Sequence, residues 1–161
     1  MIVFTDTLFA NNRDLSSQIG YVLVLVDGTG YTNIIHWSST KCKRVTRSVL
    51  ASELYGMAHG FDMGASVKST IDRVLEMELP LVVYTDSKSL YEYLIKLGTT
   101  REKRLIIDII CLRQVYKRQE ITEVKWIKGE SNPADSITKS KPTNALKRLI
   151  DTNTIQLDIE E

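Results

Sequence analysis

Short apolar runs separated by a tight turn mark the beginning of the chain. The run at 19–26 is rich in β-branched residues and ends at the DGTG turn signal of 27–30, and a second run at 31–38 follows. Two such runs on either side of a turn predict an antiparallel hairpin. The short apolar segment at 2–5 predicts a third strand beside this hairpin.

Helical periodicity dominates the next part of the chain. Ser48 can cap a helix, and apolar residues recur at three- and four-residue spacing from there to about Ser66. The pattern repeats over 67–77, which predicts a second helix. A compact apolar run at 81–85 then has the composition of a strand in the middle of a sheet.

Helices alternate with one more strand in the remaining part. A helix is predicted over 87–98, and Thr99 with Glu102 has the spacing of a capping box for the next helix. A strand is expected at 121–127, and a final helical region begins at Pro133. The order predicts one α/β domain with a mixed five-stranded sheet, in which three antiparallel meander strands precede parallel strands and helices flank the sheet.

Composition leaves this picture unchanged. The length of 161 residues fits one domain, and 43% hydrophobic and 25% charged residues are ordinary for a soluble globular chain. No apolar run reaches 18 residues, so no membrane-spanning helix is expected. Two cysteines without CxxC spacing are typical of a reduced protein, and we expect an intracellular, cytoplasmic location.

The formal net charge of +1 conceals an acidic end and a basic body. Residues 151–161 carry four of the 20 acids and none of the 21 basic residues, so the first 150 residues have a charge of +5. We therefore expect a domain over 1–150 and an acidic tail over 151–161. A mildly basic body fits a phosphate-bearing partner, although solvated helix faces alone would explain the charge.

Four carboxylates occupy positions where acids are costly. Asp6 follows a strand that should be central, Glu53 interrupts the apolar stripe of a helix, and Asp86 directly follows the most apolar strand. Asp135 lies in a first helical turn, where an acid alone is an ordinary helix-dipole partner. A carboxylate against a core must be paired or must coordinate a metal. Because no basic residue has an obvious pairing position, the four together predict a site for a divalent cation such as Mg²⁺.

The order of these acids, and the sequence around each, resembles ribonuclease H. The matching segments are ASEL at 51–54, YTDS at 84–87, WIKG at 126–129 and NPAD at 132–135. More narrowly, the chain resembles the ribonuclease H domain of copia-type LTR retrotransposon polyproteins, with fungal members nearest. The segments that carry this narrower resemblance are HWSS at 36–39, KCKR at 41–44 and NPADSITK at 132–139.

The resemblance implies the ribonuclease H-like fold and an endonuclease that hydrolyses the RNA strand of RNA–DNA hybrids. It implies two Mg²⁺ ions, which Mn²⁺ can replace. Asp6 would bridge both ions, with Glu53 and Asp86 on one and Asp135 on the other, and these four are the predicted catalytic and metal-binding residues. The candidate hybrid-binding residues are Lys41, Lys43, Arg44, Thr46, Arg47, Ser48, Ser87 and Lys88.

The resemblance also implies a context and leaves alternatives. A reverse transcriptase domain in the same polyprotein would be the partner, and a virus-like particle would be the location. One alternative is a weak or inactive module that binds hybrid or supports a reverse transcriptase; the segment 128–131 lacks the histidine that many relatives carry there. The other is a recombinase of the same superfamily, whose acids follow the order Asp, Asp, Glu. Trp37 and Trp126 are expected in the core.

Overall fold

The computed structural model describes residues 1–96, 98–141 and 143–155. In this part of the chain, the strands form one five-stranded sheet in the order β3-β2-β1-β4-β5. The first three strands make an antiparallel meander, whereas β4 and β5 run parallel to β1. The predicted mixed sheet is therefore confirmed. The strands are β1 (Ile2–Leu8), β2 (Gln18–Val26), β3 (Thr32–Lys41), β4 (Val82–Thr85) and β5 (Glu123–Trp126).

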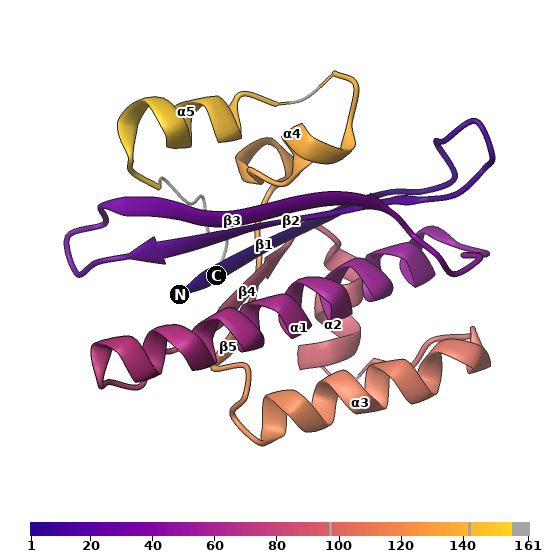
Figure 1. Ribbon diagram of the computed structural model, residues 1–161. Helices are drawn as coiled ribbons and strands as arrows, with labels where there is room; N and C mark the ends of the chain where they lie inside the picture. Colours follow the sequence, from indigo (N-terminus) through magenta and orange to yellow (C-terminus); the bar gives the residue numbers. More distant parts are fainter. Residues whose placement is uncertain (97, 142, 156–161) are drawn as a thin grey trace.

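Helices cover both faces of the sheet. Figure 1 shows α1, α2 and α3 on one face and the shorter α4 and α5 on the other. Each layer buries its own apolar cluster against the sheet. Among the described residues, none of the helices is long and apolar enough to cross a membrane. The helices are α1 (Val49–Leu75), α2 (Lys88–Ile95), α3 (Ile106–Lys117), α4 (Asp135–Thr138) and α5 (Ala145–Thr152), with 3-10 turns η1 (Lys103–Leu105) and η2 (Gly129–Ser131).

The region between β3 and β4 is one helix, so the predicted division into helices over 48–66 and 67–77 is wrong. No proline interrupts the region, and Val67 and Ile71 continue the stripe that packs against the core. Ser48 caps the helix as predicted, because its hydroxyl accepts a hydrogen bond from the Ala51 amide. The helix ends when Glu76 adopts a left-handed conformation with φ 52°.

Other boundaries differ from the sequence predictions. The helix after β4 ends at Ile95 rather than at Gly98. The predicted capping box does not form, since Glu102 is the N-cap of η1 without a side-chain cap, and its carboxylate accepts from the Ser48 hydroxyl instead. The final helical region is divided into α4 and α5. Helix α5 continues past residue 150, and most of the predicted acidic tail, residues 156–161, lies outside the described residues.

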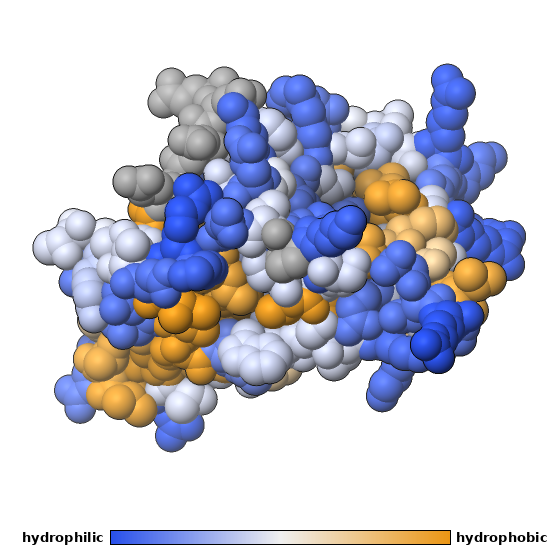
Figure 2. Space-filling model, turned by 90° about the horizontal axis from the view of Figure 1, so that it is seen from above, coloured by the Kyte–Doolittle hydropathy of each residue, from blue (hydrophilic) through white to orange (hydrophobic). Residues whose placement is uncertain are grey.

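Trp37 is not a core residue. It lies on the edge strand β3 with 61% of its surface exposed, which contradicts the prediction. Its neighbours include Ile34 and Ile150, and together they line part of an apolar groove of about 340 Å³ on the side of α4 and α5. Figure 2 views the molecule from this side, where hydrophobic residues interrupt an otherwise hydrophilic surface.

Helix α1 lies close to β1 because glycines face the strand. Gly56 and Gly60 are one helical turn apart and are both buried. A Cβ atom on Gly60 would lie 2.6 Å from the Thr5 Cγ2 atom and 3.3 Å from the Val3 Cγ1 atom. This close approach brings the preceding turn of α1, which carries Glu53, against the carboxyl-terminal half of β1.

We expect Gly60→Ala to destabilise the protein by about 2 kcal/mol, because an added methyl group overpacks the contact between helix and strand. Alanine favours a helix by about 1 kcal/mol over glycine, so the packing cost must exceed this gain. Chemical denaturation measures the difference. Ser69→Ala, at an exposed position of the same helix, is the control and should leave stability nearly unchanged. A Gly60→Ala variant as stable as its parent would show that α1 does not require this close approach.

Candidate metal centre

Three carboxylates from separate elements meet at the carboxyl ends of the inner strands β1 and β4. Asp6 lies near the end of β1, and Asp86 directly follows β4. These neighbouring strands are parallel and Thr5 pairs with Thr85, so the two aspartates are adjacent. Glu53 reaches them from the second turn of α1. One ligand oxygen from each of Asp6, Glu53 and Asp86 lies within 4.8 Å of the others.

The electrostatics of this group favour a bound cation. Asp6 is 1% exposed and Glu53 is 9% exposed. Burial, followed by repulsion from Asp86, raises the pKa of Asp6 to about 7. Burial and the charges of Asp86 and Asp6 raise the pKa of Glu53 to about 8, and burial raises the pKa of Asp86. Carboxylate oxygens are the ligands that Mg²⁺ takes, so this donor set fits the predicted ion.

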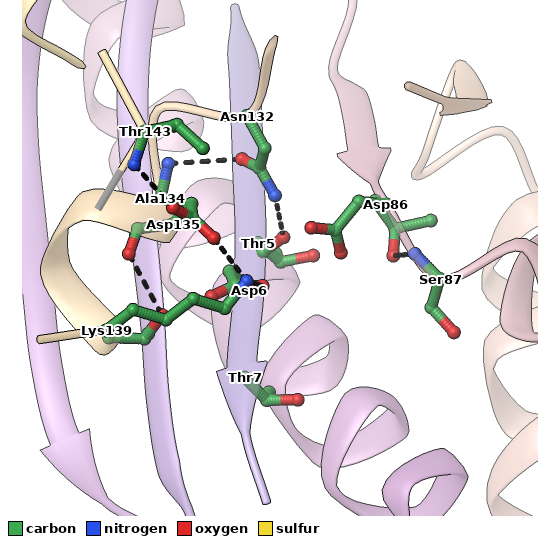
Figure 3. A network of polar contacts seen from close by, with 12 residues as sticks. Thr5, Asp6, Thr7, Asp86, Ser87, Asn132, Ala134, Asp135, Lys139 and Thr143 are labelled. Atoms are coloured by element: carbon green, nitrogen blue, oxygen red, sulfur yellow. Dashed lines mark hydrogen bonds and ion pairs between the residues drawn. The ribbon is translucent and has the colours of Figure 1, made fainter. Parts of the chain in front are cut away.

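Asp135 lies on the other side of Asp6, at the start of α4. It is buried, and its Oδ2 atom accepts a hydrogen bond of 2.9 Å from the Thr143 amide. Its Oδ1 atom pairs with the ammonium group of Lys139, which is also 3.7 Å from the Asp6 Oδ1 atom (Figure 3). Among the described residues, the group of ligand atoms within 4.8 Å comprises the other three acids. The role of Asp135 as a fourth metal ligand therefore stays a prediction.

Lys139 was missed by the argument from sequence, which expected no basic residue beside these acids. That expectation is wrong. The signal was the spacing of four residues between Asp135 and Lys139, which places oppositely charged side chains together on one helical turn. Thr138 was missed as well, and its hydroxyl donates a hydrogen bond to the Asp6 Oδ2 atom.

The segment between β5 and α4 fastens the centre to the sheet. Asn132 is fully buried, and its side-chain amide donates to the Thr5 carbonyl over 2.9 Å while its oxygen accepts from the Ala134 amide. The indole of Trp126 donates to the Asp86 carbonyl over 3.1 Å, so this tryptophan is a partly buried neighbour of the centre. A Cβ atom on Gly129 would be 3.3 Å from the Asp86 Oδ2 atom, and the glycine therefore lets this loop pass close to the carboxylate.

The predicted hybrid-binding cations lie between β3 and α1 on the surface. Lys43 and Arg47 are exposed. The guanidinium of Arg44 lies 5.0 Å from the ring centre of Tyr55, and Lys41 pairs with Asp14 over 2.9 Å. Lys43 and Arg47 are thus exposed to phosphate groups, and the role of all four cations stays a prediction.

The predicted hydroxyl contacts already have partners within the chain. Thr46 shares a hydrogen bond of 2.7 Å with Ser17, and Ser48 caps α1. Ser87 caps α2 in the same way, and Lys88 lies 5.8 Å from the ring centre of Trp126. Ser87 and Lys88 directly follow Asp86, so they lie close to the centre, and their contact with nucleic acid stays a prediction.

The sheet order, the two helix layers and the position of the acids define the class: the chain has the ribonuclease H fold. A scan of protein-family models found no match, and neither did a search of the curated proteins. Solved structures do match. The ribonuclease H1 of the halophilic archaeon Halobacterium salinarum NRC-1 is 15% identical with a TM-score of 0.62, and the match covers 91% of this chain and 96% of that one.

Two further structures extend the comparison. LC11-RNase H1, solved in complex with an RNA/DNA hybrid, is 19% identical with a TM-score of 0.62, over 90% of this chain and 98% of that one. The N-terminal ribonuclease H domain of a Mycobacterium tuberculosis protein is 18% identical with a TM-score of 0.57, over 94% of this chain and 96% of that one. At these identities the likeness establishes the fold.

Proposed function

We propose that this protein is a metal-dependent endonuclease that hydrolyses the RNA strand of RNA–DNA hybrids. The observation that carries the proposal is the convergence of Asp6, Glu53 and Asp86 within 4.8 Å at the carboxyl ends of β1 and β4. Open α/β sheets place their sites at such strand ends. Among the proteins with this fold, LC11-RNase H1 was solved with an RNA/DNA hybrid, which supports the same class of substrate.

In this proposal the acids hold two Mg²⁺ ions, or Mn²⁺ in their place. Asp6, Glu53 and Asp86 would hold one ion, and Asp6 with Asp135 would hold the other. Bound there, the ions would activate a water molecule for attack on the phosphodiester and stabilise the leaving oxygen. Thr138 fixes the orientation of the Asp6 carboxylate, and Asn132 holds the α4 segment against β1.

The exposed cations supply the contacts that position the hybrid. Lys43, Arg44 and Arg47 precede α1, the helix that carries Glu53, so a duplex held by them would lie beside the carboxylates. Lys88, next to Asp86, would contact the same duplex. The 2′-hydroxyl groups of the RNA strand, displayed in a wide and shallow minor groove, would distinguish it from DNA.

For the biological context, we propose reverse transcription of a copia-type LTR retrotransposon, with a reverse transcriptase domain in the same polyprotein. The segment NPADSITK at 132–139 supports this, because it resembles the corresponding segment of those elements and contributes Asn132, Asp135, Thr138 and Lys139 to the centre. The weak or inactive hybrid-binding module is the second candidate, favoured by one observation. The segment 128–131, which passes close to Asp86, carries no histidine.

Incubation of the protein with a labelled RNA–DNA hybrid tests the proposal. We expect cleavage of the RNA strand with Mg²⁺ or Mn²⁺ and none with EDTA, while single-stranded RNA and duplex DNA stay intact. Robust cleavage in EDTA would contradict the metal mechanism. If the protein binds the hybrid but does not cleave it with Mg²⁺ or with Mn²⁺, it is the inactive module.

The salt dependence of binding tests the basic surface. Lys43→Ala combined with Arg47→Ala should weaken hybrid binding and reduce the slope of log affinity against log salt by about 2, because each lost phosphate contact removes roughly one unit. Lys117→Ala with Arg118→Ala, exposed at the far end of α3, removes the same charge and is the matched control. Equal slopes for the two double variants would show that the segment before α1 does not contact the hybrid.

A further inference from the structure

One lysine reaches into the group of carboxylates. Lys139 directly follows α4, and its ammonium pairs with Asp135 and lies 3.7 Å from the Asp6 Oδ1 atom. In Figure 3 its side chain extends from α4 toward Asp6. The side chain is 34% exposed, so the ammonium is at the border of the centre and has a path to solvent.

The ammonium faces the oxygen atoms that a second cation would need. Both oxygens of Asp135 have partners, since Oδ1 pairs with Lys139 and Oδ2 accepts from the Thr143 amide. The Asp6 Oδ2 atom accepts from the Thr138 hydroxyl, and its Oδ1 atom faces Lys139. A divalent cation between Asp6 and Asp135 must therefore replace the lysine.

The opposite side of Asp6 has a different environment. There Asp6, Glu53 and Asp86 bring three ligand oxygens within 4.8 Å of one another. The two halves of the centre thus differ in how their negative charge is balanced. The half with Asp135 carries its own cation, whereas the half with Glu53 and Asp86 gains most from an added one.

We propose that the Lys139 ammonium occupies the place of a second divalent cation. The free protein then binds one ion at Asp6, Glu53 and Asp86, and it binds the second only after the Lys139 ammonium leaves Asp135. This inference rests on the proposed metal centre and deepens it. Its consequence is that occupation of the Asp135 position is a competition, in which an ion displaces a side chain.

Counting bound Mn²⁺ tests the proposal. Mn²⁺ prefers the same carboxylate oxygens as Mg²⁺, and its electron paramagnetic resonance signal reports the free ion. At about pH 8, we expect the parent to bind one ion. Lys139→Met, which keeps the length of the side chain and removes its charge, should bind a second ion about tenfold more tightly than the parent does. Tenfold corresponds to about 1.4 kcal/mol of repulsion removed.

Lys141→Met is the matched control, because Lys141 is exposed and lies two residues away. It removes the same net charge and should bind Mn²⁺ as the parent does. Equal number and affinity of ions in the parent and in Lys139→Met would overturn the proposal. So would a gain in the control as large as that in Lys139→Met, since the effect would then be one of net charge.

A second measurement uses the parent alone, so it holds even if Lys139→Met fails to fold. Acylation by an amine-specific reagent, read at each lysine by peptide mass mapping, should proceed several-fold faster at Lys139 once the Mn²⁺ concentration is high enough for a second ion to bind, because the displaced amine is exposed. Lys141 serves as the internal reference. An unchanged or slower rate at Lys139 would overturn the proposal. Neither experiment uses nucleic acid, so failure of hybrid cleavage and failure of this inference are distinguishable.

Discussion

Asp86→Asn should abolish hybrid cleavage while leaving the fold intact or more stable. The substitution keeps the shape of the side chain and removes one charged metal ligand. Loss of about 4 kcal/mol of transition-state stabilisation corresponds to a rate reduction of about 1000-fold. In chelator the variant should unfold at the same temperature as the parent or a higher one, because Asp86 repels both Asp6 and Glu53. Addition of Mg²⁺ should then stabilise the parent more than the variant.

Rate and stability measured together separate a ligand from a structural acid. Asp62→Asn, at an exposed position of α1, makes the same chemical change away from the centre and should alter neither quantity. Cleavage by Asp86→Asn at the parental rate would exclude Asp86 as a ligand. Unfolding of Asp86→Asn in chelator would instead identify Asp86 as a structural hydrogen-bonding acid.

In chelator, the free energy of unfolding should fall as the pH rises from about 4 to about 8. Unfolded Asp and Glu have pKa values of about 4. In the folded chain, burial first and the neighbouring carboxylates second raise the pKa of Asp6 to about 7 and of Glu53 to about 8. The folded state therefore binds more protons than the unfolded state within this window, and stability is lost as these carboxyls ionise. Each pKa unit corresponds to about 1.4 kcal/mol, so we expect a loss of several kcal/mol.

Denaturation at several pH values, with Glu53→Gln as the comparison, isolates this effect. The variant lacks one of the two groups and should show a clearly shallower decline. The comparison is needed because burial lowers the pKa of the amino group at Met1, which acts in the opposite direction. Mg²⁺ should stabilise the parent more at high pH, because it binds ionised ligands. A stability in chelator that does not depend on Glu53 over this window would contradict the close approach of the carboxyls.

The predictable part of the fold depended on local signals. The DGTG turn determined the hairpin of β2 and β3, and the apolar run before Asp86 indicated a central strand. Boundaries were less predictable, because they depend on contacts between elements. Helix α1 continues through a change in pattern since Val67 and Ile71 still pack on the core. Glu102 hydrogen-bonds to Ser48, a residue 54 positions away, rather than to its own turn.

The candidate centre could also be predicted in part from the sequence. Three of the four acids could be placed together because strand order and parallel pairing bring Asp6 beside Asp86, and a helical stripe brings Glu53 to them. Lys139 could not be placed by the same reasoning. Its pairing with Asp135 follows a helical spacing, but its approach to Asp6 depends on how α4 docks on the sheet. Trp37 was misjudged because edge strands expose side chains that a central strand would bury.

Because hydrogen bonds join α4 and the segment before it to β1, the centre can be completed only after the segment that follows β5 has been synthesised. All five strands have been synthesised by Trp126, whereas the hydrogen bonds from Asn132 to Thr5 and from Thr138 to Asp6 join residues 127 and 132 positions apart. Such contacts close nearly the whole chain into a loop, and their entropic cost is met after the sheet exists. The segment after β5 can then open as a separate cooperative unit. Local opening there would silence the centre while the sheet persists, so activity would report complete folding more sensitively than secondary structure does.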